Sequence, residues 1–359
     1  MLTYRFCFIV VCSCITVLSI AQTTFVSATD KNIHYEGRIL FANDTAELMW
    51  PGTSVTIHFT GTGIDGEFKD EDTSNYYNVI VDGNITGIMH FGKTRQTYTL
   101  ADGLPAAKHI LQLFKRTEWD KGRTWFYGFY LKSNTSLLSP LLLPKRKIEF
   151  FGNSITCGYA INDVNGDHST GYYENNYDAY AAITARHFNA QYHCTAKSGI
   201  GVMVSWFPLI MPEMYNRTDP EDSNSRWDFS QYIPDVVVID LFQNDSWIIA
   251  SHSNAQYKAR FGTKAPTAGD IIAAYKSFVQ KIRDAYPNAK IICMLGNMDI
   301  TRSGSRWPGY VQKAVTQLKD SKIFTWFAPY KNTPGHPKVA EQKALAEGLI
   351  KFIQQHIIW

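Results

Sequence analysis

Alternation of apolar and polar residues dominates the first third of the chain. Gly, Asn and Asp turn residues separate four such runs, which are 54–60, 78–82, 109–114 and 125–131. Period-two alternation between turns is typical of half-buried antiparallel strands. We therefore predict an all-β domain over residues 24–138, built as a sandwich or jelly roll.

The pattern changes beyond a Ser-, Leu- and Pro-rich linker, residues 133–144. Short apolar runs predict strands at 148–151, 192–195, 236–241, 291–295 and 323–327. Helical periodicity predicts helices at 179–188, 270–286, 310–318 and 339–356. Strands that alternate with helices favour a parallel sheet covered on both faces. We predict a three-layer α/β/α domain with a five-stranded parallel sheet over residues 145–359.

The first 21 residues have the pattern of an export signal. Arg5 gives a positive start, residues 6–20 are apolar, and Ala21 supplies a small residue for cleavage. The apolar run is shorter than the roughly 20 residues that a membrane span needs. We predict a signal peptide over 1–21, a secreted or periplasmic location and no integral membrane span; cleavage after Ala21 is favoured over a lipid anchor on Cys14.

Composition narrows the classes of function. The 35 Lys and Arg residues nearly balance 32 Asp and Glu residues, so no nucleic-acid partner is expected. Without the signal segment the chain keeps Cys157, Cys194 and Cys293, which we expect to be buried rather than paired. No His or Cys spacing fits a metal and no Gly-rich loop fits a dinucleotide, so we predict no metal and no cofactor.

Polar motifs follow two of the predicted strands or open the last helix. Ser154 comes after 148–151, Asn244 and Asp245 come after 236–241, and His336 precedes the final helix. Because the carboxyl ends of parallel strands meet at one edge of a sheet, we expect these side chains to converge there. Each motif alone also fits a turn, a helix cap or a helix entry. Their combination is what indicates a site.

Acyl transfer needs a nucleophile, a base and hydrogen-bond donors aimed at the developing oxyanion. We predict Ser154 as the nucleophile and His336 as the base. The predicted oxyanion donors are the N–H groups of Ser154 and Gly199 and the side-chain amide of Asn244. Asp245 is interpreted as a structural carboxylate that orders the Asn244 loop.

In this order the motifs resemble those of SGNH/GDSL hydrolases, and nearly all of the mature chain resembles carbohydrate esterase family 2. The matching stretches are 50–55, 145–150, 152–159, Gly199, Asn244 with Asp245, and 335–337. The resemblance implies a jelly roll joined to an SGNH domain, and an enzyme that removes acetyl groups from plant polysaccharides. It also implies the roles given above for Gly199, Asn244, Asp245 and His336.

The chain departs from the family pattern at three places. Asn153 stands where an Asp is usual, and Phe242 stands where a Gly is usual. SGNH hydrolases commonly carry an Asp two or three residues before the histidine, and Pro334 and Thr333 occupy those positions here. We therefore predict a Ser–His dyad, in which the Asn332 amide or a backbone carbonyl orients His336. Asp299, after strand 291–295, is the only nearby strand-end carboxylate that could take the place of the missing Asp.

Tryptophans in loops after the strands suit the stacking of sugar rings, and they suit loop packing equally. Trp247, three residues beyond Asn244, is the predicted substrate wall. The sequence thus predicts a secreted serine esterase that removes O-acetyl groups from xylan- or mannan-type polysaccharides through an acyl-enzyme on Ser154. Two alternatives stay open: an esterase for feruloyl or other bulky acyl groups, and a non-catalytic carbohydrate-binding protein on a decayed SGNH fold.

Overall fold

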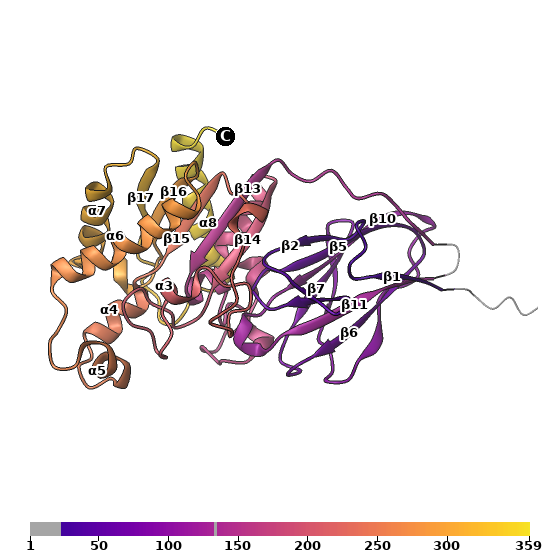
Figure 1. The fold of residues 1–359 in the computed structure, drawn as a ribbon, viewed down its shortest axis with the longest axis horizontal. Helices are drawn as coiled ribbons and strands as arrows, with labels where there is room; N and C mark the ends of the chain where they lie inside the picture. The colour runs from indigo at the N-terminus through magenta and orange to yellow at the C-terminus, as the bar shows by residue number, and fades with distance from the viewer. Residues whose placement is uncertain (1–22, 133–134) are drawn as a thin grey trace, which may run out of the picture.

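The computed structural model describes residues 23–132 and 135–359, and the predicted signal segment, 1–21, lies outside the described residues. The chain forms an all-β part and an α/β part that lie side by side (Figure 1). None of the described helices is long and apolar enough to cross a membrane.

The all-β part consists of two antiparallel sheets of six strands each. The first sheet contains β3 (Leu40–Ala42), β4 (Thr45–Leu48), β11 (Thr124–Leu131), β6 (Ile64–Asp70) and β9 (Gln96–Ala101), with β1 (Thr24–Ser27) beside β11. The second contains β12 (Ser136–Leu137), β5 (Ser54–Gly61), β10 (Ala107–Lys115), β7 (Tyr77–Val81) and β8 (Asn84–Met89), with β2 (His34–Glu36) beside β5.

Alternation along the central strands explains the sandwich. On β5, Val55, Ile57 and Phe59 are buried, whereas Thr56 and His58 between them are only partly covered. The inward residues of β5 and β10 form one core with Phe68 of β6 and Phe126 and Phe129 of β11. Burial of one face of each sheet is what a period-two pattern predicts, and the predicted all-β fold is confirmed.

The α/β part is built on a parallel sheet of five strands. In spatial order they are β14 (Ala190–Ala196), β13 (Arg146–Gly152), β15 (Val236–Asp240), β16 (Lys290–Leu295) and β17 (Ile323–Phe327). From β13 the chain passes first to one side of the sheet and then to the other. The carboxyl ends of β13 and β15 therefore flank a topological switch point, where α/β proteins place their ligands.

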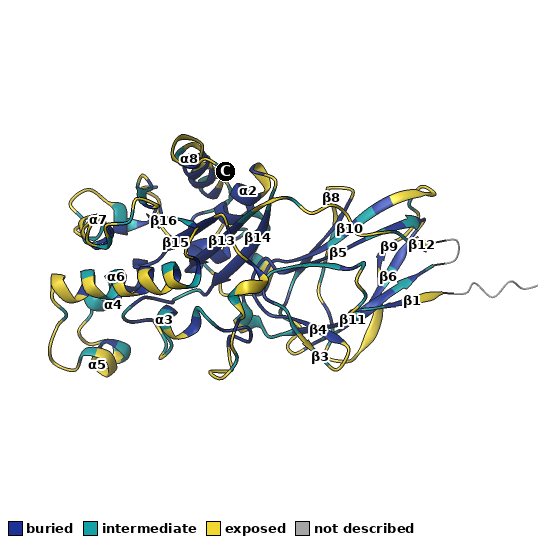
Figure 2. Cartoon of the chain, turned by 45° about the horizontal axis from the view of Figure 1, so that its top comes forward, coloured by how far each residue is buried: buried dark blue, intermediate teal, exposed yellow. Residues whose placement is uncertain are grey.

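Helices cover both faces of this sheet (Figures 1 and 2). Val237 and Ile239 of β15 pack with α6 (Ala268–Ala285) and α7 (Trp307–Leu318). Val236 and Val238 face the other way, toward α2 (Tyr180–His187) and α8 (Val339–His356). Because both faces are buried, every residue of β15 is buried, and its first four residues, 236–239, form a continuous apolar run. The predicted three-layer domain is confirmed.

The predicted strands and helices lie within about three residues of the observed ones, but the sequence pattern does not indicate the other eight strands of the all-β part, β1–β4, β6, β8, β9 and β12. Sequence periodicity did not indicate the four-residue helices α1 (Ser154–Cys157) and α3 (Met211–Met214), nor α4 (Gln243–Ile249) and α5 (Ala255–Phe261). Fewer than about two helical turns show too little periodicity to be distinguished from a loop. Among the described residues, Cys157, Cys194 and Cys293 are free and buried, as predicted.

Buried polar interactions join the two parts. Arg38 of the β-part pairs with Glu149 of β13 at 2.9 Å, and both side chains are at most 1% exposed. The Trp50 indole donates to the carbonyl oxygen of Thr218 at 2.7 Å. If the two parts shifted relative to one another, these buried polar groups would lose their partners without gaining water. Such a loss costs free energy. The β-part is therefore fixed against the α/β part.

Candidate active site

Ser154 lies on a tight turn at the carboxyl end of β13. It is the first residue of α1, and the side chain of Asn153 caps this helix by accepting the N–H of Ile155 at 2.9 Å. Asn153 thus fulfils the capping role that an Asp in this position would have. The turn closes at Gly158, with φ of +77°, where a Cβ atom would lie 2.6 Å from the Asn175 carbonyl oxygen. Only glycine fits such an approach.

A linear arrangement of three side chains begins at this serine. Ser154 Oγ lies 2.9 Å from Nε2 of His336, and Nδ1 of His336 lies 2.7 Å from Oδ2 of Asp167. A carboxylate on Nδ1 fixes the tautomer that leaves Nε2 free to accept the serine proton. This is the geometry of a Ser–His–Asp triad.

The prediction that His336 has no carboxylate partner is therefore wrong. Asn332 is exposed and has φ of +53°, and no hydrogen bond joins it to His336 within the described residues. Asp299 accepts hydrogen bonds from the Trp247 indole and the Gln243 amide instead. Asp167 lies 169 residues before His336, on the polar loop that follows α1, and no strand end or periodicity marks it.

Asp167 is held by more than the imidazole. It also accepts the backbone N–H of His336 at 2.9 Å and the Lys338 ammonium at 2.8 Å. Partial burial alone would raise the pKa of Asp167, but hydrogen bonds from His336 and Lys338 hold that pKa well below its usual value. The carboxylate is thus ionised near neutral pH. Gly335 permits this approach, since a Cβ there would lie 3.0 Å from both Asp167 oxygens.

The Gly199 loop, residues 197–204, follows β14 and presents one unpaired N–H group. Gly199 has φ of +80°, and within the described residues its N–H has no hydrogen-bond partner. The other N–H groups of this loop donate to Gly152, Glu118, Lys197, Ser205 and Asp245. Because Gly199 itself is only partly covered, its free N–H group can hold a developing negative charge on a bound substrate.

Asn244 stands at the start of α4 with its amide orientation fixed. Its Oδ1 accepts the Trp206 indole N–H at 3.1 Å, and its Nδ2 donates to the Ile200 carbonyl oxygen at 2.8 Å. Because a primary amide carries two N–H bonds, one donor remains available. Phe242, in place of the usual Gly, has φ of +78° and packs against Tyr275 and Trp307.

Asp245 orders the Gly199 loop. Its carboxylate accepts N–H groups from Val202, Met203 and Val204 at 2.7–3.1 Å. Burial raises its pKa to about 6. The sequence predicts that Asp245 orders the loop of Asn244, which is its own loop. Its carboxylate also orders the neighbouring Gly199 loop.

Two aromatic rings flank the triad and the Asn244 amide. The Tyr159 ring lies 4.7 Å from the His336 ring, centroid to centroid. Trp206 is 49% exposed, and its Cδ1 would lie 3.3 Å from a Cβ at Gly199. Trp247, the predicted substrate wall, instead points its indole N–H at Asp299 and lines a hollow with Arg302, Trp307 and Tyr310. Its contact with substrate stays a prediction.

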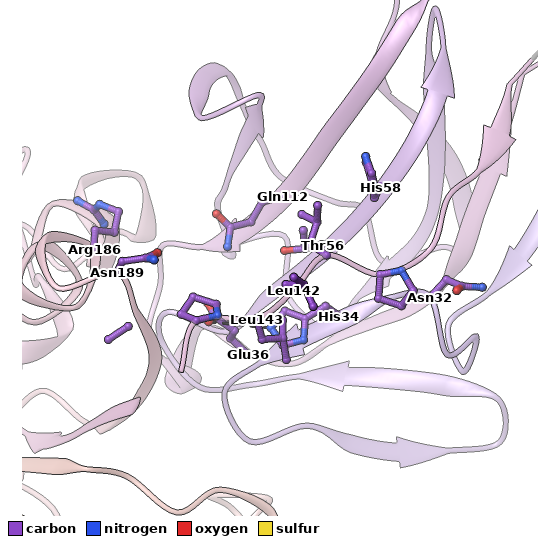
Figure 3. Close-up of a pocket in the computed structure, with 14 residues that line it drawn as sticks. Asn32, His34, Glu36, Thr56, His58, Gln112, Leu142, Leu143, Arg186 and Asn189 are labelled. Atoms are coloured by element: carbon purple, nitrogen blue, oxygen red, sulfur yellow. Dashed lines mark ion pairs between the residues drawn. The ribbon is translucent and has the colours of Figure 1, made fainter. Parts of the chain in front are cut away.

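Three carboxylates outside the triad, those of Glu118, Asp120 and Glu174, come close enough together to consider a metal. Lys121 and Lys197 already form ion pairs with all three, with Nζ–O distances of 2.6–3.3 Å. This cluster is a network of ion pairs. A separate cavity lies where the linker crosses the sandwich, between residues 140–144 and the outer face of β2, β5 and β10 (Figure 3). Neither Ser154 nor His336 lines it.

Comparisons with known protein families agree with this architecture. The model for the carbohydrate esterase 2 N-terminal domain matches residues 35–140, and the GDSL-like lipase/acylhydrolase model matches residues 150–349. The second match contains Ser154, Gly199, Asn244 and most of the parallel sheet. The chain therefore belongs to carbohydrate esterase family 2, within the GDSL-like carboxylic ester hydrolases.

Individual relatives cover nearly the whole chain. It is 34% identical over 348 residues to cellulase/esterase CelE of Acetivibrio thermocellus, a match that covers 91% of this chain and 40% of that longer protein. It is 25% identical over 349 residues to an acetylxylan esterase/glucomannan deacetylase of Cellvibrio japonicus, covering 94% and 93%. A solved family two carbohydrate esterase from Clostridium thermocellum, in complex with cellohexaose, superposes with a TM-score of 0.80 at 34% identity, covering 90% and 98%.

Proposed function

We propose that this carbohydrate esterase removes O-acetyl groups from plant cell-wall polysaccharides of the xylan or mannan type. The observation that carries the reaction is the line from Ser154 Oγ through His336 to Asp167, with distances of 2.9 and 2.7 Å. The substrate class is supported by the relative named acetylxylan esterase/glucomannan deacetylase and by the neighbour in complex with cellohexaose.

In the proposed first half-reaction, Ser154 Oγ attacks the acetyl carbonyl carbon while Nε2 of His336 accepts the hydroxyl proton. The oxyanion of the tetrahedral intermediate accepts hydrogen bonds from the N–H groups of Ser154 and Gly199 and from Asn244. Asp167 stabilises the imidazolium that forms. The intermediate then collapses, the C–O bond to the sugar breaks, and His336 gives its proton to the leaving sugar oxygen.

Water completes the proposed cycle. His336 removes a proton from the water, whose oxygen attacks the acetyl-Ser154 carbonyl, and the second tetrahedral intermediate releases acetate. The proton returns through Nε2 to Ser154 Oγ. No cofactor or metal is required for any of these steps, because bond formation and cleavage involve only the serine, the histidine and water.

The proposed location is outside the cytoplasm, because a polymeric cell-wall substrate does not enter the cell. The Arg5 start, the apolar residues 6–20 and Ala21 support export, and cleavage after Ala21 is proposed over lipid attachment at Cys14. Amino-terminal sequencing of the protein recovered from its native host tests this. A mature chain that begins at Gln22 supports the proposal, and one that retains residue 1 refutes it.

Two alternative functions differ in what supports them. The non-catalytic alternative depends on the absence of a carboxylate partner for the histidine, and Asp167 stands beside His336. The bulky-acyl alternative keeps one supporting observation: the rings of Trp206 and Tyr159 beside the site could flank an aromatic acyl group. Comparing hydrolysis of acetyl and feruloyl esters of the same sugar distinguishes the two esterases.

The deciding experiment is acetate release from acetylated xylan, acetylated glucomannan and acetylated pectin by the native sequence and by Ser154→Ala. We expect release from xylan or glucomannan, complete loss in Ser154→Ala, and loss of covalent labelling by a serine-directed phosphonate. Ser246→Ala is a matched control, because the Ser246 hydroxyl donates a hydrogen bond to the Gln243 carbonyl oxygen and lies outside the triad. Labelling that persists in Ser154→Ala contradicts the assignment.

A further inference from the structure

A loop of the β-part reaches the Gly199 loop of the α/β part. We define it as the Glu118 loop, residues 116–123, which contains a single 3₁₀ turn at Trp119–Lys121. Oε2 of Glu118 accepts the backbone N–H of Ser198 at 2.6 Å and lies 3.3 Å from the Lys197 ammonium. Asp120 accepts a second hydrogen bond from Lys197 at 2.6 Å.

These interactions act on the peptide next to the proposed oxyanion donor. Ser198 immediately precedes Gly199, and the carbonyl oxygen of Gly199 accepts the backbone N–H of Trp206 at 3.0 Å. The chain is therefore held on both sides of the Gly199 N–H, by Glu118 before it and by Trp206 after it. Preorganised donors of this kind need no reorganisation when charge develops on the substrate.

Burial makes the interaction between Glu118 and Ser198 strong. Glu118 is 1% exposed and Lys197 is 7% exposed. In such surroundings a charge-assisted hydrogen bond to a backbone N–H is worth more than it would be in water. The Lys197 ammonium lies 3.3 Å from the same carboxylate oxygen and offsets part of the cost of burying that charge.

Glu118 also contacts two other loops of the site. Its Oε2 is 3.8 Å from Sγ of Cys157, which ends the short helix that Ser154 begins. The backbone N–H of Glu118 donates to Glu174 at 3.0 Å, and Glu174 ends the polar loop that carries Asp167. The Lys115 ammonium, buried in the β-part, donates to the carbonyl oxygen of Glu118 at 3.2 Å. One β-part residue thus meets the loops of the nucleophile, of the proposed oxyanion donor and of the triad carboxylate.

We propose that Glu118 is a positioning residue for ester hydrolysis, and that the β-part is thereby a structural component of the active site. Glu118 acts through the Lys197–Ser198 peptide and does not touch substrate. Without it, the Gly199 N–H would sample orientations that do not point at the oxyanion. This inference rests on the proposed esterase function and adds to it a requirement for the β-part in the chemical step.

The test compares Glu118→Gln and Glu118→Ala with the native sequence, using a chromogenic acetyl ester. Glutamine keeps the volume and an acceptor for Ser198, and its amide nitrogen can occupy the Oε1 position, which lacks a partner among the described residues. This variant is therefore expected to fold. We expect kcat to fall about 10-fold in Glu118→Gln and about 100-fold in Glu118→Ala, with KM changed less than about twofold, since small displacements in an active site cost such factors.

A second readout separates positioning from general destabilisation. A boronic acid that forms a tetrahedral adduct with Ser154 reports the oxyanion interactions, so its affinity should fall by about the same factor as kcat. Arg123→Gln is the matched control: Arg123 lies on the same loop and pairs across the domain junction with Asp219 at 2.9 Å. It should lower the melting temperature while leaving kcat and boronate affinity unchanged.

The outcomes distinguish the two proposals. A native protein inactive on every ester refutes the proposed function. A native protein that is active, together with a folded Glu118→Gln and Glu118→Ala whose kcat and boronate affinity equal the native values, refutes the positioning role alone. The positioning role is also refuted if kcat in Arg123→Gln and in the Glu118 variants falls in the same proportion to the fall in melting temperature.

Discussion

At the scale of single residues, the site depends on a carboxylate that lies far from its histidine in sequence. Asp167 accepts three hydrogen bonds from two residues, His336 and Lys338, and these bonds set both its charge and its position. In a triad the carboxylate fixes the imidazole tautomer and stabilises the imidazolium, without itself becoming protonated. Geometry, rather than closeness in sequence, determines which Asp has this role.

Asp167→Asn should therefore lower kcat strongly, because an amide can hold the wrong imidazole tautomer and stabilises the imidazolium less. We expect a loss on the order of 10²–10⁴. Asn332→Ala, at the position that the sequence pattern predicts to orient the histidine, should stay within about twofold of the native kcat. Steady-state kinetics on a soluble acetyl ester show which of the two residues orients His336. Comparable losses of kcat in both variants would contradict the role of Asp167 and support the Ser–His dyad.

Asn244→Ala removes the side-chain donor whose orientation Trp206 and Ile200 fix. Since an oxyanion interaction forms fully only in the transition state, we expect kcat to fall by roughly 10²–10³ with KM nearly unchanged. The measurement is kcat and KM on the same acetyl ester. A rise in KM without a fall in kcat would assign Asn244 to substrate binding instead.

At the scale of elements, the ends of the parallel strands carry buried acids whose burial affects stability. Asp240 closes β15, is 1% exposed and accepts the N–H of Gly296 at 2.9 Å. Burial raises its pKa to about 7. The folded protein therefore binds this proton more tightly than the unfolded chain, whose Asp has a pKa of about 3.9.

The sign of the resulting pH dependence follows from proton binding. Between about pH 4 and 7 the folded state holds the Asp240 proton and the unfolded state does not, so this residue's contribution to stability decreases as the pH rises. Asp240→Asn keeps the shape and removes the titration. We expect the variant to gain stability relative to the native protein between pH 5 and pH 8, by on the order of 1.4 kcal/mol for each pH unit between pH 5 and the folded-state pKa of about 7.

Denaturant unfolding at the two pH values measures this difference, with Asp222→Asn as the exposed control. The control should show no change in its relative stability. A pH-independent difference between Asp240→Asn and the native protein would mean that Asp240 does not titrate in this range.

At the scale of the whole molecule, the two parts are joined by ion pairs that range from fully buried to partly exposed. Arg38 and Glu149 are the deepest of these, and Glu149 also accepts hydrogen bonds from Thr195 and Tyr286. A buried pair of this kind adds little stability over an apolar pair, but removal of one partner leaves a charge uncompensated. The domain junction therefore depends on both partners.

Arg38→Met should destabilise the protein by about 3–5 kcal/mol, because Glu149 is left buried without its counter-charge. Adding Glu149→Gln should recover part of that loss. Arg95→Met, at an exposed pair with Glu67, should cost about 0–1 kcal/mol. Denaturant unfolding followed by tryptophan fluorescence and far-UV circular dichroism provides the measurement. A loss in Arg38→Met no larger than that in Arg95→Met would contradict this account.

Sequence periodicity by itself determined the two architectures and the order of the strands and longer helices in the α/β part, but it indicated only four of the twelve strands in the all-β part. Burial on one face makes apolar residues recur at every second position in β5, and burial on both faces makes them continuous over residues 236–239 of β15. The motifs around Ser154, Asn244 and His336 could also be predicted from the sequence. They follow strands or open a helix, and the carboxyl ends of parallel strands lie at one edge of the sheet.

Only the tertiary structure decided which loop residues complete the site. Asp167 and Glu118 lie 169 and 80 residues from the groups that they hold, and neither occupies a strand end or a periodic face. A hydrogen bond depends on the separation of two atoms to within a few tenths of an ångström. Loop residues carry no repeating pattern that encodes such a separation. Their partners are fixed only when the sheet, the sandwich and the junction between the two parts bring the loops together.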